Sequence, residues 1–170
     1  LREESLALCQ ATLEAMKFGD YFVILKAHPS ADFLAELEQL WKKNGTRSAL
    51  KILTGLSGFY DYVRASDAIL LTGSSLAVEA LVLGITPIVY RTPSQFTNNP
   101  MAEIPDCALW VENSYGLKNA LEGLPSKKVD SPSQYPEHVK SGINRLFDKC
   151  LGEEQEARVR KLLVPMRERN

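Results

Sequence analysis

The sequence predicts an α/β fold, a Rossmann-like parallel sheet with helices on both faces. Short apolar segments alternate with segments of helical periodicity along most of the chain, which is typical of repeated βαβ units. The strand segments are mostly apolar rather than alternately apolar and polar, as expected of strands that are buried on both faces. A length of 170 residues favours a single domain.

The first half of the chain supplies three helices and two strands. Apolar residues at helical spacing predict the first helix, and a β-branched and aromatic run predicts the strand after it. Ser30 or Asp32 can cap the second helix, and Gly45 ends it. The predicted elements are a helix over 3–17, a strand over 21–26, a helix ending near residue 43, a strand over 49–54 and a short helix within 58–66.

The second half continues the alternation. Gly84 is placed to stop a helix, and Pro93 and Pro100 predict an irregular loop as far as residue 105. The predicted elements are strands over 67–71, 87–90 and 107–111 and helices over 75–83, 114–124, 137–150 and 153–163.

Composition and motifs exclude several classes of function. A net charge of −1 gives no field that would attract nucleic acid. Three cysteines without CxxC spacing predict buried or free thiols in a reducing compartment, and we expect no metal site. The chain lacks GxxxxGK[ST], GxGxxG and GxSxG, so a P-loop NTPase, a nicotinamide or flavin cofactor and a serine hydrolase are unsupported. No apolar run reaches the roughly 20 residues of a membrane span.

Polar residues follow four of the predicted strands directly. These are His28, Thr54 with Gly55, the segment 73–75 and Arg91. In open parallel sheets, ligands bind beyond the carboxyl ends of the strands. We therefore expect these four loops to meet at one edge of the sheet and to form a binding site there.

The sequence TGSS at residues 72–75, here called the serine turn, has the composition of an anion site. Gly73, Ser74 and Ser75 place backbone N–H groups and two hydroxyls next to Thr72 at the amino end of a helix, where the helix dipole favours an anion. The alternative is that Ser74 only caps the helix. Two adjacent serines in the most apolar part of the chain favour phosphate binding.

Glu79 and His28 extend this hypothesis. Glu79 lies one turn beyond Ser75 among apolar neighbours, so it is not part of an ordinary solvated helix face. Its carboxylate can accept hydrogen bonds from both hydroxyls of a ribose, or it can pair with the helix amino end or a nearby cation. His28, followed by a proline, can contact a phosphate oxygen or transfer a proton, or it can be purely structural.

The segment GSSLAVEALVLGITPIVY, preceded by YDYVRASDAILLT, resembles the nucleotide-sugar-binding domain of GT-B fold glycosyltransferases. It also resembles the related non-hydrolysing UDP-N-acetylglucosamine 2-epimerases. The stretch KAHP followed by GSS is similar to the paired His-Pro and Ser-Ser motifs of bacterial sialyltransferases, capsule transferases and glycerophosphotransferases. The resemblance covers residues 21–124.

The resemblance implies roles for individual residues. It assigns the phosphates of a nucleotide-sugar to the serine turn, a further phosphate contact or a catalytic role to His28, and the ribose to Glu79. The loop over 54–60, which includes Thr54 and Gly55, would face the base, and Arg91 would face the sugar. No metal or other cofactor is implied.

The resemblance also implies a larger protein. Residues 1–170 would be the carboxy-terminal, donor-binding half of a two-domain GT-B enzyme, and the amino-terminal domain, which commonly supplies the catalytic base, would precede Leu1. We expect a cytoplasmic glycosyltransferase of surface polysaccharide or glycoconjugate synthesis, peripheral to the inner face of the membrane, with a lipid-linked or glycan acceptor and no nucleic acid partner. The basic residues of the last segment would reach the partner domain or the membrane, or they would only complement the helix dipole. The alternatives for the chain are a sugar-nucleotide epimerase half-domain and a non-catalytic nucleotide-binding module.

Overall fold

The chain is described by a computed structural model. It describes residues 2–26, 34–43, 49–53, 58–92, 99–124 and 136–149. The helices are α1 (Arg2–Ala15), α2 (Leu34–Lys43), α3 (Phe59–Ala65), α4 (Leu76–Val82), α5 (Ser114–Glu122) and α6 (Glu137–Lys149). The strands are β1 (Phe22–Lys26), β2 (Ala49–Leu53), β3 (Ala68–Leu71), β4 (Thr86–Tyr90) and β5 (Leu109–Val111). Three 3-10 helices complete the described elements: η1 (Met16–Phe18), η2 (Pro100–Glu103) and η3 (Pro105–Cys107).

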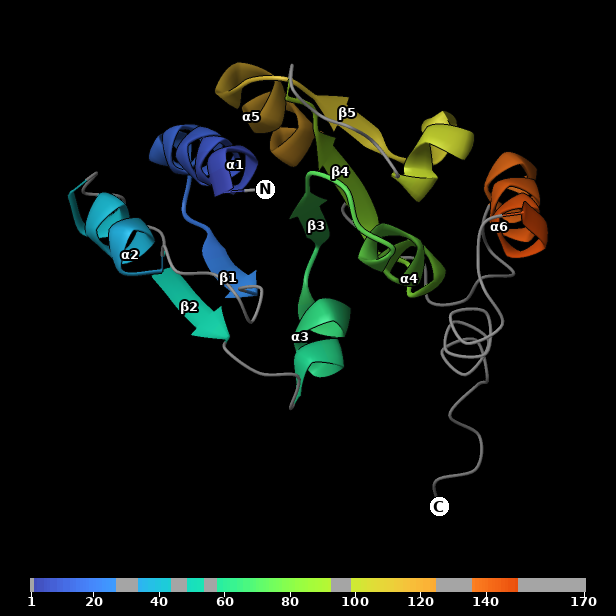
Figure 1. The fold of residues 1–170 in the computed structure, drawn as a ribbon, viewed down its shortest axis with the longest axis horizontal. Helices are drawn as coiled ribbons and strands as arrows, with labels where there is room; N and C mark the ends of the chain where they lie inside the picture. Colours follow the sequence, from blue (N-terminus) through green and yellow to red (C-terminus); the bar gives the residue numbers. More distant parts are fainter. Residues whose placement is uncertain are drawn as a thin grey trace.

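The predicted α/β class with parallel strands is confirmed. The described strands form two parallel sheets, one of β1 and β2 and one with the order β3-β4-β5. Figure 1 shows the strands crossing the molecule in the order β2, β1, β3, β4, β5. The two sheets thus follow one another spatially, although β1 and β3 are not hydrogen-bonded as neighbours.

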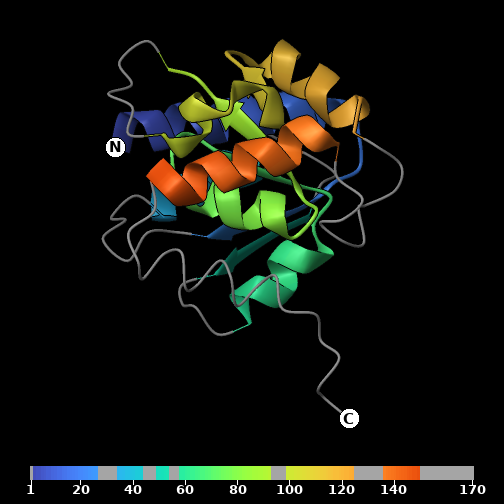
Figure 2. The same ribbon diagram turned by 90° about the vertical axis from the view of Figure 1, so that its right-hand side faces the viewer.

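Helices cover both faces of the larger sheet, and the side chains of β4 alternate between them. Ile88 and Tyr90 belong to a core that α1 and α5 close, whereas Val89 belongs to a core that α4 and α6 close. Figure 2 shows α6 lying along α4 on this second face. Because β4 is buried on both faces, its sequence is apolar from Pro87 to Tyr90.

The structure corrects the prediction for the region before β5. Prolines were expected to exclude regular structure as far as residue 105, but Pro100 and Pro105 each begin a 3-10 helix. A proline at the first helical position has a suitable φ and loses no hydrogen bond, so it begins such a helix instead of preventing it. The predicted strand over 107–111 is correspondingly shorter, because Cys107 belongs to η3.

Several sequence predictions fall outside the described residues. They are the cap at Ser30 or Asp32, the stop at Gly45 and the helix over 153–163. Within the described part of the chain, no helix has both the length and the apolar character that crossing a membrane requires.

Candidate functional site at the carboxyl edge of the sheet

The serine turn connects the carboxyl end of β3 to α4. The Ser74 hydroxyl accepts a hydrogen bond from the Leu76 N–H at 3.2 Å, so Ser74 does cap the helix locally. Ser75 occupies the N-cap position, and its side chain makes no capping bond. The N–H groups of Gly73, Ser74 and Ser75 have no acceptor among the described residues. Three consecutive backbone donors and the Ser75 hydroxyl therefore remain available to a ligand.

A buried asparagine holds the serine turn from outside the motif. Asn99 is 4% exposed, and its Nδ2 donates to the carbonyl oxygen of Thr72 at 3.3 Å. Its Oδ1 accepts from the Met101 N–H at 3.0 Å, which caps η2. One side chain thus connects the start of η2 to the end of β3.

Glu79 lies one helical turn after the serine turn, on a helix that is otherwise apolar. It is 5% exposed and is the one buried carboxylate among the described residues. The phenol of Tyr60, at the start of α3, donates a hydrogen bond to its Oε2. The Tyr60 ring stands edge-on to Phe59 with 5.5 Å between ring centroids, so the phenol is part of the packing between α3 and α4. The partner of Glu79 therefore comes from the end of the loop that was expected to face a base.

The turn at the end of α4 has the geometry that its sequence predicts. Gly84 has a φ of +80°, which a glycine adopts without strain. The Ile85 N–H donates to the carbonyl oxygen of Ala80 at 2.9 Å, which closes the helix and starts the chain towards β4. This return places the end of β4 beside the serine turn, because Leu71 pairs with Val89 in the parallel ladder.

Arg91 follows β4 at this edge of the sheet. Its N–H donates to the carbonyl oxygen of Val111 at 2.8 Å. Its guanidinium carbon lies 4.3 Å from the centre of the Trp110 ring, and its Nη1 lies 3.9 Å from Glu112 Oε1. The guanidinium is half-exposed, so the ion pair adds little to stability, and its main effect is to direct the side chain over Trp110.

A surface cavity of about 200 Å³ opens next to Arg91. The Oγ1 of Thr92, which also lines the cavity, is buried and has no hydrogen-bond partner in the described part of the chain. A polar ligand or water molecule usually satisfies such a group. The lining residues are Glu3, Glu4, Ala7, Tyr90, Arg91, Thr92 and Glu112.

The predicted site residues are therefore only partly brought together. The serine turn and Glu79 form one continuous unit, and Arg91 lies past the end of the neighbouring strand. The serines and Glu79 do not line the cavity next to Arg91. His28, Thr54 and Gly55 lie outside the described residues.

Sequence reasoning assigned no individual role to Tyr60, Asn99 or Thr92. Asn99 precedes a proline, and this pair is a typical start of a turn. The cap that Asn99 forms on η2 could therefore be predicted from the local sequence. The bond from Asn99 to Thr72 joins residues 27 positions apart, and the bond from Tyr60 to Glu79 joins residues 19 positions apart. No local sequence pattern predicts pairs that are so distant in the chain.

The perturbed titrating groups among the described residues are cysteines, and neither lies in the serine turn. Burial raises the pKa of the Cys9 thiol to about 11. The pKa of Cys107 is raised by burial and by the negative charge of Asp106, against an opposing effect of Arg145. Both are free thiols.

Comparison with protein families, curated proteins and solved structures finds no match to this chain.

Proposed function

We propose that the chain binds a nucleotide-activated sugar at the carboxyl edge of β3 and β4, as the donor-binding half of a glycosyltransferase of surface polysaccharide synthesis. The observation that carries the proposal is the serine turn, where three consecutive N–H groups lack an acceptor among the described residues. Consecutive backbone donors of this kind, with a hydroxyl next to them, suit the oxygens of a diphosphate.

The buried carboxylate supplies the second part of the proposal. A carboxylate accepts hydrogen bonds through both oxygens, so Glu79 suits the two hydroxyls of a ribose. It is 5% exposed and holds the Tyr60 phenol, so a ribose reaches it only when that phenol turns away. Nucleotide binding would therefore be coupled to the breaking of the Tyr60–Glu79 bond.

In this proposal the chemistry is group transfer without a metal ion. The N–H groups of the serine turn, with His28, would stabilise the negative charge that develops on the departing phosphate. The amino-terminal domain of the full protein would supply the catalytic base and the acceptor site, in the cytoplasm at the inner membrane surface. We therefore expect this chain alone to bind nucleotide without turnover.

A thermal-shift panel of UDP, CDP, CMP, GDP and TDP tests the proposal, because a ligand of the native state raises the melting temperature. Ser75→Ala and Glu79→Gln should each weaken the affinity for the best nucleotide by about 1.5–3 kcal/mol, the value of a charge-assisted hydrogen bond. That corresponds to a Kd raised roughly tenfold to a hundredfold.

Ser66→Ala is the matched control. Ser66 precedes β3, at the opposite end of the strand from the serine turn, and its hydroxyl bonds only locally to the carbonyl oxygen of Tyr62 at 2.8 Å. Its replacement should leave the Kd unchanged. A chain that no nucleotide stabilises, or a Ser75→Ala variant that binds like Ser66→Ala, contradicts the proposal.

A further inference from the structure

The buried side chain of Asn99 uses both ends of its amide, and each contact has one possible chemistry. The Met101 N–H can only donate, so the atom 3.0 Å from it is the amide oxygen. The carbonyl oxygen of Thr72 can only accept, so the atom 3.3 Å from it is the amide nitrogen. An amide offers both a donor and an acceptor, whereas a carboxylate offers only acceptors. Because Asn99 is 4% exposed, bulk water cannot replace either contact.

A second asparagine shows that capping alone does not require this arrangement. Asn113 caps α5 through its Oδ1, which accepts from the Gly116 N–H at 2.8 Å. Its side chain is exposed, and its Nδ2 donates to no residue in the described ranges. The buried donation from Asn99 to Thr72 is therefore additional to the cap that Asn99 forms on η2.

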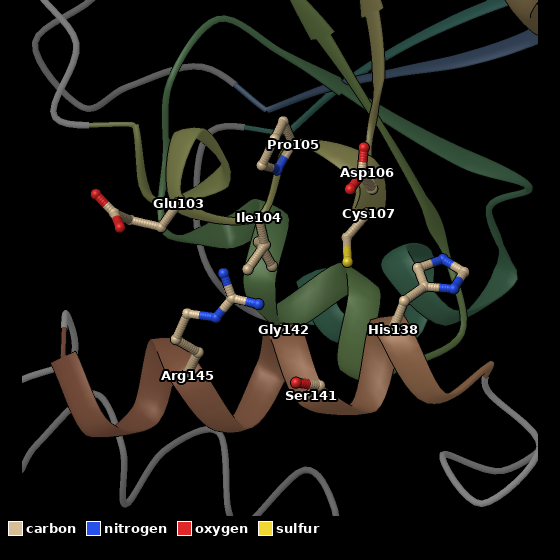
Figure 3. Close-up of a pocket in the computed structure, with 9 residues that line it drawn as sticks. All are labelled: Glu103, Ile104, Pro105, Asp106, Cys107, His138, Ser141, Gly142 and Arg145. Atoms are coloured by element: carbon tan, nitrogen blue, oxygen red, sulfur yellow. The ribbon is translucent and has the colours of Figure 1, made fainter.

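The segment η2–η3, which Asn99 precedes, packs closely against α6. Figure 3 shows Ile104 and Cys107 pointing towards α6, beside a surface cavity of about 220 Å³. The approach is so close that a Cβ added at Gly142 would lie 3.0 Å from Ile104 Cγ2. Met101 is fully buried in the same core, which α4 and α6 also form. Asn99 therefore donates to the serine turn from a firmly packed part of the chain.

The contact at Thr72 also determines where the next backbone donor points. The carbonyl group of Thr72 and the N–H of Gly73 belong to one planar trans peptide unit, in which they point in opposite directions. Holding the carbonyl oxygen towards Asn99 thus directs the Gly73 N–H away from Asn99. A glycine restricts its own backbone least, so this direction depends on a hold from outside the turn. The Gly73 N–H is the first of the three donors without an acceptor among the described residues.

We propose that Asn99 is a positioning residue of the phosphate site, whose buried amide holds the Thr72–Gly73 peptide so that the Gly73 N–H faces a phosphate oxygen. The inference rests on the function proposed for the serine turn, and it adds a residue that does not itself contact the ligand. A donor that is oriented before the ligand arrives leaves less backbone freedom to lose on binding. Loss of the hold should therefore weaken the binding of phosphate groups and leave that of the nucleoside part unchanged.

The variant Asn99→Ser tests this inference in the whole chain. Serine still accepts from the Met101 N–H as an N-cap residue, but it is too short to reach Thr72. In ¹⁵N relaxation, the order parameter of the Gly73 amide should fall from about 0.85 in the unmodified chain to below about 0.6. Asn99→Asp keeps an acceptor for the cap and lacks the donor, so it should mobilise the same amide. Asn113→Ser is the matched control and should leave the Gly73 order parameter unchanged.

Calorimetry of the same variants separates positioning of the phosphate donors from a general loosening of the fold. Asn99→Ser should raise the Kd for the best nucleotide about tenfold, the effect of weakening one charge-assisted hydrogen bond. The Kd for the corresponding nucleoside, which lacks the phosphates, should stay the same, and Asn113→Ser should change neither value. Equal weakening of nucleotide and nucleoside binding overturns the inference, as does a Gly73 amide that stays rigid in both Asn99 variants.

Failure of this inference differs from failure of the proposed function. If Asn99 has no positioning role, the unmodified chain and Asn99→Ser bind the nucleotide equally well. If the proposed function is wrong, no nucleotide binds even to the unmodified chain. The Gly73 order parameter then still decides whether Asn99 holds the serine turn.

Discussion

Replacement of Tyr60 by Phe isolates the hydrogen bond to the buried carboxylate of Glu79. The ring stays in place against Phe59, so the change removes one hydroxyl and little packing. A hydrogen bond to a charged group contributes about 1.5–3 kcal/mol, and Glu79, at 5% exposure, cannot regain the lost donor from bulk water. We expect the free energy of unfolding to fall by this amount, which for a chain of this length lowers the melting temperature by roughly 3 to 12 °C.

The neighbouring tyrosine of α3 provides the matched control. Tyr62 accepts a hydrogen bond from Lys51 Nζ at the surface, and the lysine also lies 4.7 Å from the centre of its ring. Tyr62→Phe removes the same atom but leaves the ring contact. Because this bond lies at the surface, water can replace the lost hydroxyl, so the free energy of unfolding should fall by less than about 0.5 kcal/mol. Urea denaturation of the two variants measures the difference. Equal effects would refute the assignment of the Tyr60 bond to the buried carboxylate.

The same variant should have the opposite effect on nucleotide binding. If a ribose must displace the Tyr60 phenol from Glu79, the unmodified chain loses that bond on binding, whereas Tyr60→Phe has none to lose. Its affinity for the best nucleotide should therefore rise roughly tenfold, the equivalent of about 1.4 kcal/mol. Calorimetry of both proteins measures this change. Unchanged or weaker binding by the variant would refute displacement of the phenol.

The remaining predictions concern the stability of the fold. A methyl group at Gly142 would lie 3.0 Å from Ile104 Cγ2 and 3.1 Å from Cys107 Sγ. This overpacking should destabilise the chain by roughly 1–3 kcal/mol in Gly142→Ala, and the higher helix propensity of alanine offsets part of that loss. At Gly116 the nearest atom is 3.6 Å away, so Gly116→Ala should stabilise it by about 0.5–1 kcal/mol, and urea midpoints should move in opposite directions. Because folding raises the pKa of Cys9 from its ordinary 9.0 to about 11, its contribution is complete below pH 9 and is lost as pH rises to 11. The loss of about 2–3 kcal/mol over this interval should be absent from Cys9→Ala in unfolding measured against pH.

The order of elements was predictable because each depends on neighbours in sequence. The apolar period of α1, the β-branched run of β1 and the glycine after α4 are local signals, and Gly84 indeed has a φ of +80°. The 3-10 helices before β5 were missed because Pro100 was interpreted as excluding regular structure, whereas Pro100 and Pro105 each begin a 3-10 helix. Trp110 Nε1 donates to the carbonyl oxygen of Pro105 at 2.8 Å, and the side chain of Asn99 caps η2 while it holds β3.

The candidate site was predictable to the same extent. A Gly-Ser-Ser turn between a strand and a helix is a local arrangement, and the pairing of Leu71 with Val89 then places Arg91 at the same edge. The burial of Glu79 and its phenol partner depend on how α3 packs against α4. Sequence reasoning identified an acid in an apolar helix but had no means of finding the group that holds it.

Stability alone does not explain why an acid occupies this position of α4. Replacing both partners of a buried polar pair by apolar groups of similar shape is often neutral or stabilising, whereas removing one partner is costly. The double variant Tyr60→Phe/Glu79→Leu should therefore unfold at a urea concentration equal to or above that of the unmodified chain. If the carboxylate serves a ribose, the same variant should lose nucleotide affinity by at least tenfold while its fold is intact. A double variant that is stable and still binds nucleotide would instead make Glu79 a purely structural partner of Tyr60, and the serine turn would then have to account for the affinity without it.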